Sequence, residues 1–473
     1  MECAERDLLA IPRGVITAPA GCGKTQLIVK AIAAYCGKKP VLVLTHTNAG
    51  VAALRSRLRY NTVSANVYRL HTIDGWAMRL VAFFPKRSGH HPEFLDGDKP
   101  DYQAIRDAAS KLLKSGHVNE VLKASYQNLI VDEYQDCSLA QHEMVKFLSQ
   151  LFHTVILGDP MQAIFGFRNN SLVDWNTDVC AHFSPIGSLE IPWRWKNVGA
   201  EELGAWLLDV RKRLVNNEPV DLQKAPSHFV KWFKLPEDYK QRLTAIRRSL
   251  SQYFNRKNAL IIADSSNINQ QRTLARNIYG VSLVEAVELT DLMEFCESFE
   301  VKGENALVQV LEFAQKMMTQ VYLKKMIDRL ECLQRKTEKK SPDGFEIASL
   351  KFKERLTFLN VMNLLSALAK RPKVCVFRPT LFNGLIRTLR EASVGLSLKK
   401  AAQRVRNQNR LFGNFLPNCA LGSTLLFKGL EAEVVVILNP ETMTAENLYV
   451  VLTRGAKRIV VCSHTPLIIP KSQ

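Results

Sequence analysis

Short apolar runs recur along the chain, and each ends at a glycine, a proline or a polar residue. They are rich in Val, Ile and Leu, which is typical of parallel strands buried on both faces of a sheet. The runs lie at residues 41–45, 129–133, 154–159, 188–192, 259–264 and 434–438, with a further strand at 14–16. This pattern predicts an α/β fold built on parallel sheets.

Helical patterns fill much of the remaining sequence. Residues 48–59 predict a short amphipathic helix with Arg55, Arg57 and Arg59 exposed. A longer stretch, about 295–415, is mainly helical and carries basic segments such as residues 403–410. We therefore expect a helical region beside the parallel sheets.

Length and charge narrow the class of protein. A chain of 473 residues is too long to fold around a single hydrophobic core, so we expect two to four domains. The formal net charge is +19 and the isoelectric point is near 9.5. This positive charge favours binding to a polyanion such as nucleic acid. The alternatives are that it keeps the protein soluble or binds an acidic protein partner.

The cysteines and the hydropathy pattern indicate a compartment. The ten cysteines form no CxxC pair and no Cys/His cluster with zinc spacing. We expect them to be reduced, mostly buried thiols, with Cys22 as the one reactive handle. No apolar run of about 18 residues and no signal peptide is evident, so we expect a cytoplasmic protein with no membrane partner.

Residues 14–25, GVITAPAGCGKT, join an apolar strand to a glycine-rich loop that ends in Lys-Thr. Such a loop points backbone N–H groups at phosphate oxygens, while its lysine reaches the β- and γ-phosphates and its threonine binds Mg²⁺. The residues expected to bind nucleotide here are Ala20, Gly21, Cys22, Gly23, Lys24 and Thr25. The alternative is a strand–helix turn without a ligand. ATP and Mg²⁺ are the predicted cofactors.

A pair of carboxylates, Asp132 and Glu133, ends the run at 129–133. Ligands of open α/β folds bind at the carboxyl ends of the strands, where this pair is expected to lie. We expect Asp132 to hold Mg²⁺ together with Thr25, and Glu133 to orient and deprotonate the attacking water. An acidic helix N-cap is the alternative interpretation.

Several segments together resemble the superfamily 1 helicases of the UvrD/Rep/PcrA branch. They read LTHTN (44–48), LIVDEYQD (129–136), ILGDPMQAIFGFR (156–168), PWRW (192–195), KGLE (428–431) and NLYVVLTRGAK (447–457). The resemblance implies two RecA-like motor domains with parallel sheets, plus helical 1B-like and reduced 2B-like insertions. The implied boundaries are 1–83 and 126–195 for the first motor domain, 84–125 for the 1B-like insertion, 196–294 and 416–473 for the second motor domain, and 295–415 for the 2B-like insertion.

The resemblance also implies roles for individual residues. Gln162 would sense the γ-phosphate, and Arg194 and Arg454 would contact it from the second motor domain as catalytic arginines. Trp193 would stack on adenine and Glu431 would bind the ribose. The implied DNA-binding residues are His46, Thr47, Asn48, His71, Phe165, Phe167 and Arg168.

Packing is the alternative role for several of these side chains. Phe165 and Phe167 alternate with smaller residues as in a half-buried strand, and Trp193 could pack at a domain boundary. Packing is the preferred interpretation for Trp195. An isolated histidine such as His71 is more often structural than ligand-binding.

The chain departs from the family pattern in three places. The first dozen residues lack the glutamine that reads adenine, His46 stands where the family has phenylalanine, and Leu425 and Leu426 replace polar residues before KGLE. The polar residues help to couple nucleotide to DNA, so their replacement predicts weak unwinding.

The expected function is an ATP-dependent DNA helicase or translocase with 3′–5′ polarity, acting on single-stranded or tailed duplex DNA. The alternative is a DNA-sensing, nucleotide-hydrolysing regulatory component of a nuclease complex. In overall plan the chain is similar to the helicase-like component of the bacterial Gabija anti-phage system. A phosphate-loop kinase is disfavoured by the two arginine motifs and the GDPMQ segment.

Overall fold

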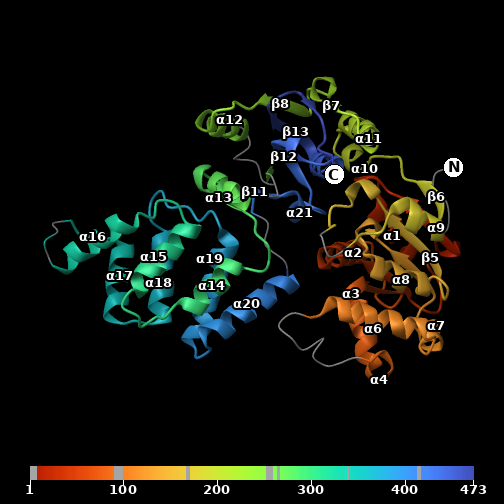
Figure 1. Ribbon diagram of the computed structural model, residues 1–473, viewed down its shortest axis with the longest axis horizontal. Helices are drawn as coiled ribbons and strands as arrows, with labels where there is room; N and C mark the ends of the chain where they lie inside the picture. The colour runs from red at the N-terminus through yellow and green to blue at the C-terminus, as the bar shows by residue number, and fades with distance from the viewer. Residues whose placement is uncertain are drawn as a thin grey trace.

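The computed structural model describes residues 8–89, 100–166, 171–251, 259–263, 267–335, 337, 340–412 and 417–472. The chain forms two sheet-containing bodies and one helical body, which is inserted within the second of them (Figure 1). Phe167 and Arg168, which we expected to contact DNA, lie outside the described residues.

The first body contains a six-stranded sheet in the order β3-β2-β4-β5-β1-β6, and every neighbouring pair is parallel. Its strands are β1 (Arg13–Thr17), β2 (Val41–Thr45), β3 (Tyr68–Thr72), β4 (Asn128–Val131), β5 (His153–Gly158) and β6 (Ser184–Ser188). Its α-helices are α1 (Lys24–Ala33), α2 (Asn48–Tyr60), α3 (Ile73–Phe83), α4 (Pro85–Ser88), α6 (Tyr102–Lys114), α7 (Asn119–Ser125), α8 (Leu139–Leu148) and α9 (Cys180–His182). Short 3₁₀ turns are η2 (Leu8–Ala10), η3 (Tyr134–Asp136) and η4 (Pro160–Gln162), and η5 (Trp175–Val179) is a π-helical turn.

The central strands of this sheet are apolar on both faces because helices cover both faces. Leu42 and Leu44 of β2 pack into the core that contains α3, α6 and α8. Val41 and Val43 alternate with them and pack into the core that contains α1 and α2. This burial on both sides explains the continuous apolar run in the sequence. The segment 84–125 packs into the first of these cores through α6 and α7.

Two helices, α10 (Trp193–Lys196) and α11 (Glu201–Val215), connect the first body to a second parallel sheet with the order β10-β11-β9-β12-β13-β8. Its strands are β8 (Val230–Lys234), β9 (Ala259–Ala263), β10 (Ser282–Leu283), β11 (Cys419–Ser423), β12 (Ala432–Leu438) and β13 (Gly455–Ser463). Its α-helices are α12 (Tyr239–Ser251), α13 (Ile268–Asn277), α21 (Thr424–Phe427) and α22 (Ala445–Leu452). The 3₁₀ turns η6 (Leu222–Lys224) and η7 (Pro440–Thr442) and the antiparallel pair β7 (Val220–Asp221) and β14 (Leu467–Ile468) complete it.

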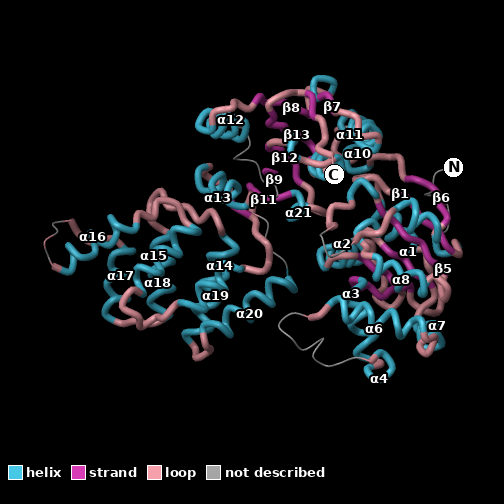
Figure 2. Tube along the Cα trace, in the orientation of Figure 1, coloured by secondary structure: helices cyan, strands magenta, loops and turns pink. Residues whose placement is uncertain are grey.

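A helical body is inserted between β10 and β11. It consists of α14 (Thr290–Ser298), α15 (Ala306–Met317), α16 (Leu323–Gln334), α17 (Gly344–Glu354), α18 (Phe358–Ala369), α19 (Pro379–Ser393) and α20 (Leu398–Phe412). These helices enclose a hydrophobic core of their own and lie beside the two sheets (Figure 2). The predicted fold class, α/β with two parallel-sheet domains and helical insertions, is confirmed.

The local predictions can be checked element by element. The amphipathic helix expected at 48–59 is α2, and its three arginines are exposed. The strand expected at 188–192 is wrong, because β6 ends at Ser188 and precedes most of that run. β6 is an edge strand that is exposed at most positions, so it lacks the apolar run that marks a buried strand. No helix of the described chain is long and apolar enough to span a bilayer.

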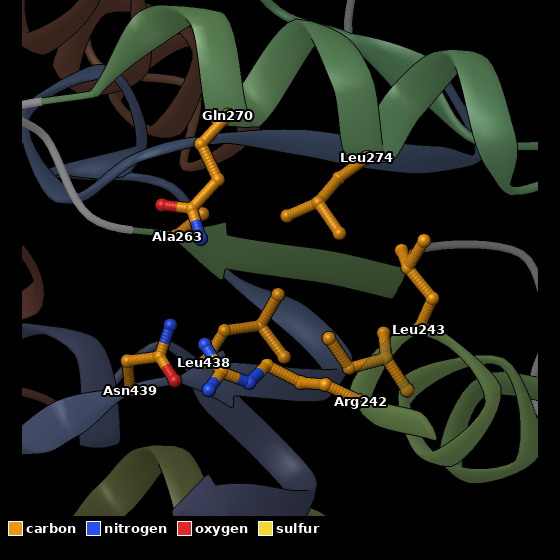
Figure 3. A pocket seen from close by; sticks show the side chains of 8 residues that line it. Arg242, Leu243, Ala263, Gln270, Leu274, Leu438 and Asn439 are labelled. Atoms are coloured by element: carbon orange, nitrogen blue, oxygen red, sulfur yellow. The ribbon is translucent and has the colours of Figure 1, made fainter. Parts of the chain in front are cut away.

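A small pocket lies at the carboxyl ends of β9 and β12, between α12 and α13 (Figure 3). Its lining residues are Arg242, Leu243, Ile246, Ala263, Gln270, Leu274, Leu438 and Asn439. The Arg242 guanidinium donates to the carbonyl oxygens of Pro236 at 3.1 Å and Glu237 at 2.9 Å, so the backbone holds it in place. None of the predicted site residues lines this pocket.

Candidate nucleotide site and nucleic-acid surface

The glycine-rich loop connects β1 to α1 at the carboxyl edge of the first sheet. Gly21 and Gly23 have φ values of 73° and 89°, a conformation that other residues adopt only with strain. A Cβ on Gly21 would lie 2.6 Å from the ring of Trp195, so glycine is also required by packing. The N-cap residue of α1 is Gly23, which has no side chain to cap the helix. The loop therefore presents backbone N–H groups and a helix dipole suited to an anion.

Lys24 joins this loop to the carboxylates that follow β4. Its Nζ lies 3.2 Å from Oδ1 of Asp132 and 2.6 Å from Oε1 of Glu133. Burial alone would lower the pKa of Lys24, but the two carboxylates raise it above its ordinary value. Burial would raise the pKa of Glu133, but the charges of Lys24 and Lys428 lower it to about 2. Glu133 is therefore ionised at neutral pH.

The donor set fits a magnesium–nucleotide complex. Thr25, in the first turn of α1, and buried Asp132 supply the hard oxygen ligands that Mg²⁺ prefers. Lys24 supplies a cation for phosphate oxygens. The Nε of Arg194 is buried and has no hydrogen-bond partner among the described residues, so it can donate to a further acceptor. The residues predicted for ATP and Mg²⁺ are thus gathered at one edge of the sheet.

Cys22, within the loop, corrects one prediction. Its side chain is buried, and its Sγ lies 3.8 Å from the carbonyl oxygen of Ala20. Burial, reinforced by the charge of Asp159, raises the pKa of Cys22 to about 12. Because the thiolate is the reactive form, this cysteine is not the oxidation or alkylation handle expected from the sequence.

Gln162 connects the two sheet bodies. It ends the short turn η4 that follows β5, and its Nε2 donates to Oδ2 of Asp159 at 3.1 Å. Its Oε1 accepts a hydrogen bond from Arg454 at 3.3 Å. Arg454 follows α22 of the second body and is 2% exposed. Burial and the nearby Arg194 lower the pKa of Arg454 to about 10, so its guanidinium remains charged at neutral pH.

Arg194, in α10, binds groups of the second body. It donates to Oε1 of Glu431 at 2.8 Å and to the carbonyl oxygen of Thr453 at 2.6 Å. The structure therefore brings together Arg194, Arg454 and Glu431, three residues that lie far apart in sequence.

The tryptophans of the PWRW segment separate into two roles. Trp193 is 43% exposed and lies against the loop, since a Cβ on Gly23 would approach its Cδ1 to 3.0 Å. Lys196 lies over the Trp193 ring, 5.0 Å from its centroid. Trp195 is fully buried, and its Nε1 donates to the carbonyl oxygen of Gly455 at 2.8 Å. The packing role expected for Trp195 is therefore confirmed, whereas Trp193 lies against the glycine-rich loop.

Two further contacts across the bodies were not predicted. Lys428 of the KGLE segment lies 2.6 Å from Oδ2 of Asp136 and also donates to the carbonyl oxygen of Gln162. The hydroxyl of Tyr449 accepts a hydrogen bond from the N–H of Ala20 at 3.0 Å. Lys428 and Tyr449 lie in segments that resemble family motifs. Their partners depend on packing between domains, which the sequence pattern does not predict.

The predicted nucleic-acid residues that follow β2, begin α2 or lie in β3 are also at the carboxyl edge of the first sheet. Thr47 caps the N-terminus of α2 by accepting from the N–H of Gly50, and exposed Asn48 begins that helix. The His46 ring lies 5.6 Å from that of Phe165 at an angle of 35°, and the Nζ of Lys428 lies 4.6 Å from the centroid of the Phe165 ring. Phe165 is half-buried and contacts both His46 and Lys428.

The histidines of this surface lie in different electrostatic surroundings. Burial lowers the pKa of His46 to about 4, and its Nδ1 has no partner among the described residues. Burial also lowers the pKa of His71, and the nearby charges of Arg79, Arg55 and Arg69 lower it further. Cations therefore surround His71, as a surface for a polyanion requires.

The sequence is similar to one family model and to short segments of known proteins. A family model described as "AAA domain" matches residues 4–168, which include the glycine-rich loop, Asp132, Glu133 and Gln162. The chain is 35% identical over 69 residues to an ATP-dependent helicase/nuclease protein of Lactococcus lactis subsp. lactis (strain IL1403), which is 14% of this chain and 6% of that protein. It has the same identity and coverage with the exonuclease/helicase subunit RexA of Lactococcus lactis subsp. cremoris (strain MG1363).

Among solved structures, the chain is similar to arterivirus nonstructural protein 10 (helicase) in complex with DNA. The TM-score is 0.37 and the identity is 10%, over 97% of this chain and 62% of that chain. The matched segment covers only 6% of each of the two Lactococcus lactis relatives, so the chain spans a small part of their length. The match to the AAA-domain family model, at residues 4–168, thus falls in the first body of this chain.

Proposed function

We propose that this chain is a DNA-stimulated ATPase of the UvrD-like superfamily 1 helicase type, which moves along single-stranded DNA with 3′–5′ polarity. The observation that carries the proposal is the contact between Arg454 of the second body and Gln162 of the first, beside the Lys24, Asp132 and Glu133 cluster. A phosphate site completed by an arginine from another domain is suited to hydrolysis that depends on domain closure.

The residues support hydrolysis by positioning and charge. Bound Mg²⁺, held by Thr25 and Asp132, would neutralise phosphate oxygens. Glu133 orients the attacking water and accepts its proton. Lys24 and the two arginines, Arg194 and Arg454, stabilise the negative charge that develops on the transferred phosphoryl group. Trp193 provides a face on which the nucleotide base stacks, and Glu431 accepts a hydrogen bond from its ribose.

DNA is proposed to bind at the carboxyl edge of the first sheet. His46 and Phe165 offer flat rings for base stacking, and the arginines around His71 attract the phosphate backbone. Lys428 contacts both Phe165 and Asp136, so the DNA surface and the nucleotide site share a side chain.

The proposal is tested by the rate of ATP hydrolysis with and without single-stranded oligothymidylate. We expect Mg²⁺-dependent hydrolysis that the oligonucleotide accelerates, and no hydrolysis by the Lys24→Ala variant. A wild-type protein that fails to hydrolyse ATP under either condition would remove the proposal.

One observation favours a second candidate, a DNA-sensing regulatory component that controls a partner nuclease, as in an anti-phage complex. Leu425 and Leu426 lie in α21, and Leu426 packs against the core of the second body. Apolar side chains cannot make hydrogen bonds to DNA phosphates. This candidate predicts DNA-stimulated hydrolysis without separation of a 3′-tailed duplex. Processive unwinding by the purified chain would instead favour the motor.

A further inference from the structure

A buried series of hydrogen bonds runs from α11 to the arginine of the second body. Arg211 of α11 donates to Oδ1 of Asp159 from Nε at 3.1 Å and from an Nη atom at 2.7 Å. Oδ2 of Asp159 accepts from Nε2 of Gln162 at 3.1 Å, and Oε1 of Gln162 accepts from Arg454 at 3.3 Å. Arg211 is therefore connected to the proposed hydrolytic site through two intervening side chains.

The two side-chain oxygens of Asp159 set the direction of this series. The side chain is fully buried, and Oδ1 also accepts from the N–H of Met161 at 3.3 Å. Both oxygens accept hydrogen bonds from their neighbours, and the Gln162 amide presents its nitrogen to Oδ2. The amide oxygen then faces Arg454, which can only donate. With this polarity every donor meets an acceptor.

We propose that Arg211 is a positioning residue for hydrolysis, because its two hydrogen bonds hold the Asp159 carboxyl group in place and so fix the Gln162 amide with its oxygen toward Arg454. The inference rests on the function proposed above and assigns a role to a helix outside the motifs. Arg211 does not touch the reacting atoms and acts through Asp159 and Gln162.

The surroundings of Asp159 leave Arg211 as its close cationic partner in the described structure. Cys22 of the glycine-rich loop and Tyr449 of α22 also face the carboxylate, and burial followed by the charge of Asp159 raises the pKa of each. Both are neutral at physiological pH. Gln135 accepts from the backbone N–H of Asp159 at 3.0 Å and adds no charge.

Loss of Arg211 would release the Asp159 carboxyl group, because both of its hydrogen bonds from α11 would be gone. The Gln162 amide, which Asp159 holds through Oδ2, would no longer be fixed with its oxygen toward Arg454. Arg454 would then lose its contact with Gln162 and leave a buried donor unsatisfied.

Helix packing makes the arrangement part of domain closure. Leu207 and Val210 of α11 share a hydrophobic core with Leu448 and Tyr449 of α22, the helix that precedes Arg454. Arg211 and Arg454 therefore approach the Asp159–Gln162 turn from the same packed unit. Closure of the second body onto the first would set the amide direction as the arginine arrives.

The test compares kcat and KM for ATP hydrolysis in Arg211→Gln, Arg211→Lys and wild-type protein. Arg213→Gln is the matched control, because Arg213 lies on the same helix and pairs with Asp209 at 2.9 Å on the exposed surface. Thermal unfolding and binding of a fluorescent nucleotide are measured on each variant.

We expect Arg211→Gln to lower kcat by at least about tenfold, because the Gln162 amide is no longer fixed toward Arg454. Nucleotide affinity should change little. Arg211→Lys, which keeps a cationic donor for Asp159, should recover most of kcat, and Arg213→Gln should match the wild-type protein.

A folded Arg211→Gln variant with wild-type kcat, or with a loss that lies in nucleotide affinity and not in kcat, would overturn the inference. If that variant does not fold, Arg211→Lys decides, since a folded Arg211→Lys protein that loses nucleotide affinity at unchanged kcat is the contrary result. Failure of the wild-type protein to hydrolyse ATP at any pH would instead count against the proposed function.

Discussion

Glu133 has a backbone conformation that is uncommon for a residue with a side chain. Its φ is 56° and its ψ is 40°, in the left-handed region, at a cost of about 1–2 kcal/mol. The surrounding contacts hold it there, because Gln135 donates to Oε2 at 2.6 Å and Lys24 pairs with Oε1. Strain that neighbouring groups maintain is typical of functional sites.

The charge of Lys24 also affects the basicity of Glu133. A carboxylate with a pKa of about 2 is a weak general base. Phosphate oxygens that attract Lys24 would weaken its pairing with Glu133, and the carboxylate would become more basic when nucleotide is bound. The same ion pair would thus limit activation of water until substrate arrives.

Replacement of this base gives the first prediction at the residue scale. Glu133→Gln should reduce kcat by about 10²-fold or more, because the water loses its proton acceptor. Nucleotide affinity, measured by fluorescence titration, should persist, whereas Lys24→Ala should weaken it. Near-normal turnover by Glu133→Gln would remove this residue from the mechanism.

At the scale of the elements, apolar runs were sufficient to locate most strands. β2, β4, β5, β9 and β12 are buried within their sheets, so their sequences carry the continuous apolar pattern. The edge strand β6 is exposed at most positions and was misplaced for that reason. Site residues that follow strands directly, such as Asp132, could also be placed, because parallel strands end at a common edge.

Contacts between elements that lie far apart in the chain could not be predicted from the sequence. Arg211 lies on an ordinary amphipathic helix, and only packing of α11 against the second body brings it to Asp159. Lys428 and Asp136 both lie in recognised segments, but their pairing depends on how the two sheets face each other. No local periodicity specifies such long-range contacts.

The pairing of Lys428 with Asp136 gives a prediction for pH. Burial raises the pKa of Asp136 to about 7, although the charge of Lys428 acts in the opposite direction. A carboxyl group with a raised pKa in the folded state contributes stability at low pH, and this contribution is lost as pH rises through about 7.

We therefore expect the stability of wild-type protein relative to Asp136→Asn to be greater at pH 5 than at pH 8. Denaturant titration of both proteins at each pH measures this difference. Comparison of the two proteins cancels the titration of His46 and His142, whose pKa values burial lowers to about 4. A difference that does not vary with pH would contradict the prediction.

At the scale of the whole molecule, the two sheet bodies meet through charged and polar side chains close to the nucleotide loop. Arg194 pairs with Glu431, Trp195 donates to Gly455, and the N–H of Ala20 donates to Tyr449. The helical body joins the second sheet body through buried Arg378, whose Nε donates to Oε1 of Glu285 at 2.9 Å. The contacts between the two sheet bodies would therefore transmit their closure directly to the proposed nucleotide site.

The central claim is that one nucleotide site is shared by the two sheet bodies. The most direct test measures kcat and nucleotide affinity for Arg194→Ala and Arg454→Ala. The matched control is Lys457→Ala, which removes only an exposed pair with Glu433. Arginines that contact phosphate chiefly in the transition state should reduce kcat by at least about 10²-fold and change nucleotide affinity little. If both variants retain wild-type kcat and only raise KM, the shared-site account is contradicted.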